Sequence, residues 1–217
     1  MPLISILAPH KNEPTEWLQE CIQSVQVQSF MDWELLIIDD CSDKAPILNT
    51  IDSRIILIAR THSSGIVDCN NIGAGYAKGQ WLMPFSCNDQ MMDGCLSDLA
   101  RLTKEFPDSA AIGTNSGYWG KAILKDVTLG GCCLISRKWW DKMGGYVKNP
   151  EYLGQGLEDW HMWIRLWQAG ASVAVSDKYL INHRQHANAV DSIVGTKRFS
   201  EIRDWIYEQN KIRLEDL

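Results

Sequence analysis

No Cys-x-x-Cys pair occurs in this sequence, and the number of cysteines is odd. The seven cysteines are Cys21, Cys41, Cys69, Cys87, Cys95, Cys132 and Cys133. Regular spacing and an even count are the signs of a disulfide framework or a zinc knuckle, so neither is indicated. We therefore expect reduced thiols in a cytoplasmic protein.

Other absences bear on partners, targeting and membrane segments. The chain has no block of basic residues and carries a net charge of −6, which argues against nucleic acid or an anionic membrane as the main partner. The N-terminal apolar run, Leu3–Ala8, is too short for a signal peptide and has no basic segment before it. No run approaches the ~20 apolar residues of a membrane helix, so we expect no integral membrane segment.

Linkers and repeats are missing as well. No stretch rich in proline, glycine or serine divides the 217 residues, and no internal repeat is visible. A chain of this length can form one domain with a full core. We expect a single folded domain, and the sequence leaves its oligomeric state open.

The sequence does contain apolar runs, each followed by a helical pattern. The runs show no polar alternation, as expected for strands covered on both faces of a parallel sheet. After the first run, Leu18, Ile22 and Val25 recur at helical spacing. Four such units in about 110 residues predict a doubly wound α/β fold. The runs are Leu3–Ala8, Glu34–Ile38, Ile55–Ala59 and Trp81–Phe85.

The second half of the chain is less regular. Its patterns predict strands at Ala110–Gly113, Gly131–Ile135, Ser172–Val175 and Tyr179–Asn182, and helices at Arg137–Met143, Glu158–Ala169 and Lys197–Leu217. Gly144 and Gly145 suit the end of the first of these helices. We expect residues 115–127 to be irregular and Tyr146–Leu157, with its glycine and proline breaks, to be a mobile loop. Trp163 and Trp167 are four residues apart, so we expect both in the core.

Polar residues end two of the buried runs. Three carboxylates lie within Asp39–Asp43, and Ser86–Asp89 follows the Trp81 run. Ligands of open α/β sheets bind at the carboxyl ends of strands, so these carboxylates are candidates for holding a ligand or its cation. The alternatives are an Asx turn at Asp39 and a cap, formed by Asp89, of the helix that begins near Gly94.

A set of motifs spread over roughly residues 3–190 is the most specific signal in the chain. The motifs are Ser5–Asn12, Glu34–Asp43, then Gly65, Asn71, Gly73, Ala77 and Gly79, and later Gly144-Gly145-Tyr146, Glu158-Asp159-Trp160 and His183-Arg184-Gln185-His186 with Asn188. In order and spacing they resemble family 2 glycosyltransferases. The resemblance implies the GT-A fold, a Rossmann-like, mostly parallel central sheet flanked by helices. It implies a donor half at 1–114, an acceptor half at 115–196 and a C-terminal helix at 197–217.

The resemblance also implies how a nucleotide-sugar donor would be held. Asp39 would hydrogen-bond the nucleotide base, usually uracil, and Asp40 would lie near the ribose. Pro9, His10 and Asn12 would form the turn under the base. Carboxylates suit this task because they accept hydrogen bonds from base N–H groups and ribose hydroxyls.

For the diphosphate, the resemblance implies a divalent metal, Mn²⁺ or Mg²⁺, held by Asp89, with His186 approaching the metal or the phosphates. The sequence departs from the family here, because Ser86, Cys87 and Asn88 stand where further aspartates are usual. Hard ions favour anionic oxygen, so we expect weak metal binding that the donor assists. Asn88 could supply a carbonyl oxygen or bond the ribose.

At the acceptor side, Asp159 is similar to the family's catalytic base, with Glu158 beside it. The alternative is that both carboxylates only stabilise the start of a helix. Trp160 is either a platform for a sugar or a core residue. Asn71 belongs to the donor motif, and Asn70 stands where the family often has an arginine, which removes one candidate cation for the phosphates.

These features predict an inverting glycosyltransferase that moves a sugar from a nucleoside-diphosphate sugar, a UDP-sugar, to a hydroxyl of a glycan or other acceptor. The first alternative is a nucleotide-sugar-binding protein without activity, which the reduced aspartate motif favours. A second is a nucleotidyltransferase of similar fold, but the sequence has no glycine-rich phosphate loop near its N-terminus. Of the two late histidines, we expect His186 rather than His183 to reach the diphosphate. Cys132 and Cys133 fit the acceptor pocket or the core equally well.

Overall fold

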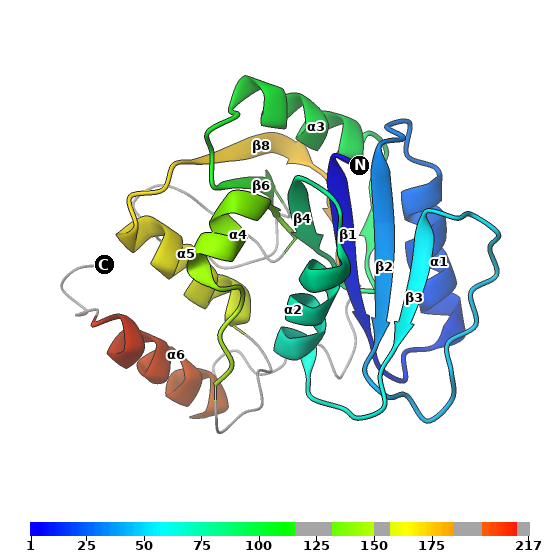
Figure 1. Ribbon diagram of the computed structural model, residues 1–217, viewed down its shortest axis with the longest axis horizontal. Helices are drawn as coiled ribbons and strands as arrows, with labels where there is room; N and C mark the ends of the chain where they lie inside the picture. The colour runs from blue at the N-terminus through cyan, green and yellow to red at the C-terminus, as the bar shows by residue number, and fades with distance from the viewer. Residues whose placement is uncertain (116–131, 150–156, 185–196, 212–217) are drawn as a thin grey trace.

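A seven-stranded mixed sheet forms the centre of the protein, with helices packed on both of its faces (Figure 1). The computed structural model describes residues 1–115, 132–149, 157–184 and 197–211. Within these ranges the strands follow the order β3-β2-β1-β4-β7-β6-β8. Four of the six strand pairings are parallel, so the predicted α/β architecture with a mostly parallel sheet is confirmed.

Four parallel strands make up the first half of the sheet. They are β1 (Ile4–His10), β2 (Trp33–Asp39), β3 (Ile55–Ala59) and β4 (Trp81–Pro84). β1 lies between β2 and β4, so Ile4 is level with both Trp33 and Trp81. Every residue of β2 and β4 is buried, which explains why these runs show no polar alternation. Pro84 is tolerated because it is the last residue of its strand.

Helices bury apolar side chains against both faces of this sheet. On one face, α1 (Thr15–Gln26) and α3 (Cys95–Glu105) contribute to a single core cluster. On the other face, α2 (Ile66–Tyr76) shares a cluster with α4 (Arg137–Met143) and α5 (Glu158–Gln168). A fully buried aliphatic or aromatic side chain stabilises a fold by about 1.5–3 kcal/mol, so these two layers fix the sheet between them.

The second half of the sheet reverses direction at β7 (Leu134–Ser136), which pairs antiparallel with both β4 and β6 (Ala111–Asn115). β8 (Val173–Tyr179) then pairs parallel with β6 and forms the edge. Two strands were predicted here, at Ser172–Val175 and Tyr179–Asn182, and two are present, but the predicted bounds are wrong because β8 continues through Asp177 and Lys178 to Tyr179. Both charged residues are exposed, as is usual on an edge strand.

Trp163 and Trp167 of α5 were both predicted to lie in the core, and this is correct for Trp163 alone. Trp163 is 1% exposed, whereas Trp167 is 40% exposed. α6 (Lys197–Asn210) packs Ile202 and Ile206 against Ile164 of α5.

The described helices include none that is long and apolar enough to cross a membrane. Residues 116–131, 150–156 and 212–217 lie outside the described part, and with them most of the predicted irregular segment, the mobile loop and the end of the C-terminal helix.

A small second sheet joins distant parts of the chain. β5 (Gln90–Met91) pairs antiparallel with β9 (Ile181–Asn182), so that Gln90 lies opposite Asn182. Asp89 directly precedes β5, and His183 directly follows β9. The helix after β5, α3, begins at Cys95 with Gly94 at φ +77° and has no side-chain cap, so the alternative in which Asp89 caps this helix is wrong.

Candidate active site

Polar residues stand where β1, β2 and β4 end, and the carboxyl ends of β1 and β2 lie at the lower edge of the sheet in Figure 1. His10 ends β1, Asp39 ends β2, and Asp89 follows β4. All three side chains are buried. Buried polar and charged groups require hydrogen-bonding partners, so their surroundings define what the edge can bind.

The loops after β1 and β2 form one unit. His10 Nδ1 lies 3.2 Å from Asp39 Oδ1, and the Ser42 hydroxyl donates to the same carboxylate. Asn12, at φ +54°, donates its backbone N–H to Ser42 Oγ over 2.9 Å and exchanges hydrogen bonds with Asp43 through its side chain. The predicted base-binding residues within this unit are Pro9, His10, Asn12 and Asp39. Their contact with a nucleotide stays a prediction.

Asp40 is enclosed by the segment that leads into α2. Its carboxylate accepts hydrogen bonds from Arg60 at 2.7 Å, Ser63 at 2.7 Å, and the backbone N–H groups of Ser64 at 2.9 Å and Gly65 at 3.0 Å. Burial raises the pKa of Asp40, but the hydrogen bonds from Ser63, Ser64 and Gly65 outweigh it and hold the pKa below its ordinary value. Both oxygens therefore shape this loop, and the ribose contact stays a prediction.

Asn71 contacts the segment that follows α4 directly. Its amide nitrogen donates to the Tyr146 carbonyl, and the Tyr146 N–H donates to its amide oxygen, both over 2.9 Å. Burial raises the pKa of Tyr146 well above its usual value, and the neighbouring Asp159 and Glu158 raise it further. Asn71 thus positions the residue that lies beside the predicted base. Its predicted contact with substrate remains untested.

Asp89 and His183 face each other at one end of the β5–β9 ladder, where Asp89 precedes β5 and His183 follows β9. Asp89 Oδ2 lies 2.9 Å from His183 Nδ1, and Asp89 Oδ1 accepts the backbone N–H of Arg184 over 2.9 Å. Arg184 also donates to the carbonyl of Asn88, pairs with Glu20 and lies over the Trp17 ring. The pairing that links Asp89 to His183 is therefore supported by backbone and side-chain contacts.

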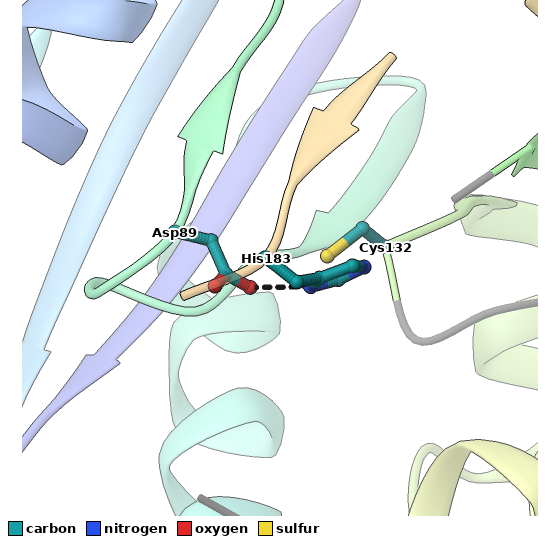
Figure 2. Close-up of side chains that lie close together, drawn as sticks. All are labelled: Asp89, Cys132 and His183. Carbon is teal, nitrogen blue, oxygen red and sulfur yellow. Dashed lines mark hydrogen bonds and ion pairs between the residues drawn. The ribbon is translucent and has the colours of Figure 1, made fainter. Parts of the chain in front are cut away.

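Cys132 completes a cluster with this pair (Figure 2). One ligand atom from each of Asp89, Cys132 and His183 lies within 4.8 Å of the others. Burial raises the pKa of the Cys132 thiol well above its usual range, with a smaller contribution from Asp89. The side-chain oxygen of Asn88 accepts a hydrogen bond from the Ser86 hydroxyl. His186, the predicted metal ligand, lies outside the described residues.

The predicted base is at the start of α5, after Leu157 at φ +63°. Asp159 Oδ1 accepts the Trp160 N–H over 2.7 Å. Burial raises the pKa of Asp159, and this hydrogen bond only partly offsets the effect. The Trp160 ring meets Tyr207 of α6 edge-on, with centroids 5.7 Å apart. Glu158 lines a small pocket between α5 and α6.

Several residues that build this edge had no assigned role in the sequence-based prediction of the site. They are Ser42, Arg60, Cys132, His183 and Arg184. Ser42 lies within the Asp39–Asp43 motif, and His183 and Arg184 lie within the motif that ends at His186, so their positions were signals. The partnership of His183 with Asp89 had no local signal, because it depends on the pairing of β5 with β9.

The chain was compared with protein-family models. The family described as "Glycosyl transferase family 2" matches residues 5–142, and the one described as "N-terminal domain of galactosyltransferase" matches residues 114–188. The first match covers more than half of the chain. The chain belongs to glycosyl transferase family 2, as its motifs predicted.

Curated relatives include named glycosyltransferases. A UDP-Glc:alpha-D-GlcNAc-diphosphoundecaprenol beta-1,3-glucosyltransferase of Escherichia coli is 31% identical over 90 residues, 40% of this chain and 35% of that protein. A GalNAc(5)-diNAcBac-PP-undecaprenol beta-1,3-glucosyltransferase of Campylobacter jejuni is 27% identical over 164 residues, 73% of this chain and 44% of that protein. The chain spans 9% to 44% of the length of the curated relatives it matches.

Solved structures show the same fold. TarS of S. aureus in complex with UDP-GlcNAc superposes with a TM-score of 0.69 at 16% identity, covering 88% of this chain and 61% of that one. A mannosyltransferase from Pyrobaculum calidifontis in complex with GDP-Man and Mn²⁺ gives a TM-score of 0.67 at 14% identity, covering 88% of this chain and 59% of that one. The predicted GT-A fold is confirmed.

Proposed function

We propose that the protein transfers a sugar from a UDP-sugar to a hydroxyl of a glycan or other acceptor, with inversion at the anomeric carbon. Two beta-1,3-glucosyltransferase relatives, one of them named for UDP-Glc, support a nucleotide-sugar donor. The observation that carries the proposal is the Asp89–His183 pair at the carboxyl end of β4, where open α/β sheets bind their ligands.

The residues at this pair fit a divalent cation. Asp89 offers a carboxylate oxygen and His183 an imidazole nitrogen, and both could serve as ligands. With one carboxylate and one imidazole, phosphate oxygens must supply most of the remaining ligands. Bound there as Mn²⁺ or Mg²⁺, the metal would neutralise charge on the leaving diphosphate. We assign this role to His183, and the role predicted for His186 remains open.

The remaining steps fall to side chains of the two halves. Asp39, held by His10 and Ser42, hydrogen-bonds the base, and Asp40 anchors the loop beside the ribose. Asp159 accepts the proton of the acceptor hydroxyl as that hydroxyl attacks the anomeric carbon. Its raised pKa makes it a stronger base than an ordinary aspartate. A single base opposite the leaving group is the arrangement that inverts configuration.

Coupled titrations test the metal and the donor together. Mn²⁺ should bind the protein weakly alone and clearly in the presence of UDP, and by linkage Mn²⁺ should tighten UDP by the same factor. Asp89→Asn and His183→Ala should each remove this coupling, whereas Asp108→Asn, at an exposed position, should keep it. If Mn²⁺ leaves the affinity for UDP unchanged and transfer survives EDTA, Asp89 and His183 do not hold a catalytic metal.

The main alternative is a nucleotide-sugar-binding protein without activity. Its support is that Ser86, Cys87 and Asn88 replace the usual carboxylates, and that Asn88 bonds Ser86. Product analysis with a panel of nucleotide sugars and Mn²⁺ separates the two functions. UDP release above that of Asp159→Asn supports transfer, and donor binding without any release supports the alternative.

A further inference from the structure

The three groups around Asp89 form a mixed set of donor atoms. Asp89 offers oxygen, His183 offers nitrogen and Cys132 offers sulfur. Mg²⁺ favours oxygen ligands in octahedral geometry. Nitrogen and sulfur together are typical of zinc, and thiolate is the most selective of the three for soft or borderline ions. The chemistry of this site therefore differs from that of a site made of carboxylates.

The fold brings these donors together from three separate segments. Cys132 lies just before β7, which is anchored by antiparallel pairing with β4. Asp89 and His183 flank the β5–β9 ladder. Figure 2 shows His183 between Asp89 and Cys132. The ligand atoms lie within 4.8 Å of one another, and a sulfur and a nitrogen on tetrahedral zinc are about 3.6 Å apart.

The site is shielded from solvent. The Cys132 side chain is 4% exposed. Asp89 is buried as well, and its Oδ2 faces His183 Nδ1. Attraction between a cation and these groups is stronger in such a place than in water.

We propose that this site binds a thiophilic divalent cation of the Zn²⁺ class through Asp89, His183 and Cys132. The inference rests on the proposed metal site and concerns which metals that site prefers. On binding, a metal–sulfur bond forms, the thiol releases one proton to solvent, and no group is oxidised or reduced. Three protein ligands hold the ion without nucleotide and leave a fourth position for a phosphate oxygen. Mn²⁺, in contrast, depends on the donor for most of its ligands.

Cobalt is a suitable probe because tetrahedral Co²⁺ replaces Zn²⁺ and gives visible absorption, with a near-ultraviolet charge-transfer band when thiolate is a ligand. Reduced, nucleotide-free protein should show this band on titration with Co²⁺, and Zn²⁺ should abolish it. Cys132→Ser should lose the band and bind Zn²⁺ at least tenfold more weakly. Cys41→Ser, at an exposed cysteine, should retain both properties.

The wild-type spectrum alone can overturn the proposal, which matters if Cys132→Ser folds poorly. A cobalt complex without the thiolate band, or a band that survives Cys132→Ser, shows that Cys132 is not a ligand. Mn²⁺ binding as tightly as Zn²⁺ without nucleotide also overturns it. UDP affinity measured on the same samples separates the two proposals. A normal cobalt spectrum without UDP binding rejects the proposed function and supports the thiophilic site.

Discussion

Asn71 and Tyr146 bind each other through two hydrogen bonds, each 2.9 Å long, between one side-chain amide and one backbone amide. Asn71 lies in α2, and Tyr146 follows α4. Because the neighbouring Asp159 raises the pKa of Tyr146, the pair connects α2 to the proposed base. Gly145 makes this contact possible, since a Cβ there would lie 2.4 Å from Asn71 Oδ1.

The first prediction compares two adjacent glycines. Gly144 and Gly145 have φ values of +73° and +74°, so alanine at either is strained by about 1–2 kcal/mol. A Cβ at Gly144 meets open space, whereas one at Gly145 collides with Asn71. Gly145→Ala should therefore lower the free energy of unfolding by about 1–3 kcal/mol more than Gly144→Ala. Denaturant titration measures both, and equal losses would show that the Asn71 contact adjusts freely.

The second prediction concerns Asp40. Its folded pKa is below the value of about 3.9 expected in the unfolded chain. The ionised form therefore stabilises the fold fully above about pH 4, and this contribution is lost as the pH falls through the lower folded pKa. Asp40→Asn should cost about 2 kcal/mol at neutral pH and less in acid. Asp108→Asn, at an exposed position, is the control. A cost independent of pH would contradict the assignment.

The third prediction concerns Asp159, whose ionisation destabilises the fold, in contrast to that of Asp40. The folded pKa of Asp159 is raised by burial, so its ionisation destabilises the fold as the pH rises from about 4 through that raised pKa. Asp159→Asn should therefore be more stable than wild type at neutral pH, and the difference should vanish in acid. Transfer should fall by about 10²–10⁴ because the base is lost. Asp141→Asn, at an exposed position on α4, should change neither.

Two measurements decide the role of Asp159. The pH–rate profile of the wild type should lose activity on its acid side at a higher pH than an ordinary aspartate would give. Turnover of Asp159→Asn within a few-fold of wild type would leave Asp159 as a carboxylate that only stabilises the start of α5.

The fourth prediction concerns the nucleotide base. Asp39→Ala removes the acceptor that His10 and Ser42 hold in place, so UDP should bind about 1–3 kcal/mol more weakly. Calorimetry with UDP measures the change. Asp108→Ala, at an exposed position outside this loop, is the control. Unchanged affinity of Asp39→Ala for UDP would remove Asp39 from the base site.

The first four strands could be predicted well because most of their residues are buried on both faces of the sheet. Such strands appear as continuous apolar runs, and β1 to β4 were each found within two residues of their bounds. β8 was misread because edge strands carry charges that resemble a turn, as Asp177 and Lys178 do. Trp167 was wrongly predicted to be buried. Helical spacing shows that Trp163 and Trp167 share a face of α5, but it does not show whether other elements cover that face along its whole length.

The carboxylates of the site could be predicted from their place at strand ends, but their partners could not. Asp40 is adjacent to Asp39 in sequence, yet it faces the loop at residues 60–65 while Asp39 faces His10. The partner of Asp89 depends on a pairing between residues more than 90 positions apart. No local pattern encodes such a contact, which is why His183 was not preferred over His186.

The β5–β9 ladder has a consequence for how this protein can diversify. Its two residue pairs set Asp89 opposite His183, and a slip of one position would turn the facing side chains to the other side of the ladder. Loops within the 89 residues between Met91 and Ile181 can lengthen or shorten without moving the pair, provided that these four ladder residues keep their register and β6, β7 and β8 keep their places in the sheet. Chains that differ in these loops should therefore share the Asp89–His183 pair, whereas the third donor, Cys132, depends on the segment between the two ladder strands. A single-residue insertion within β9 should abolish the site while leaving the seven-stranded sheet intact.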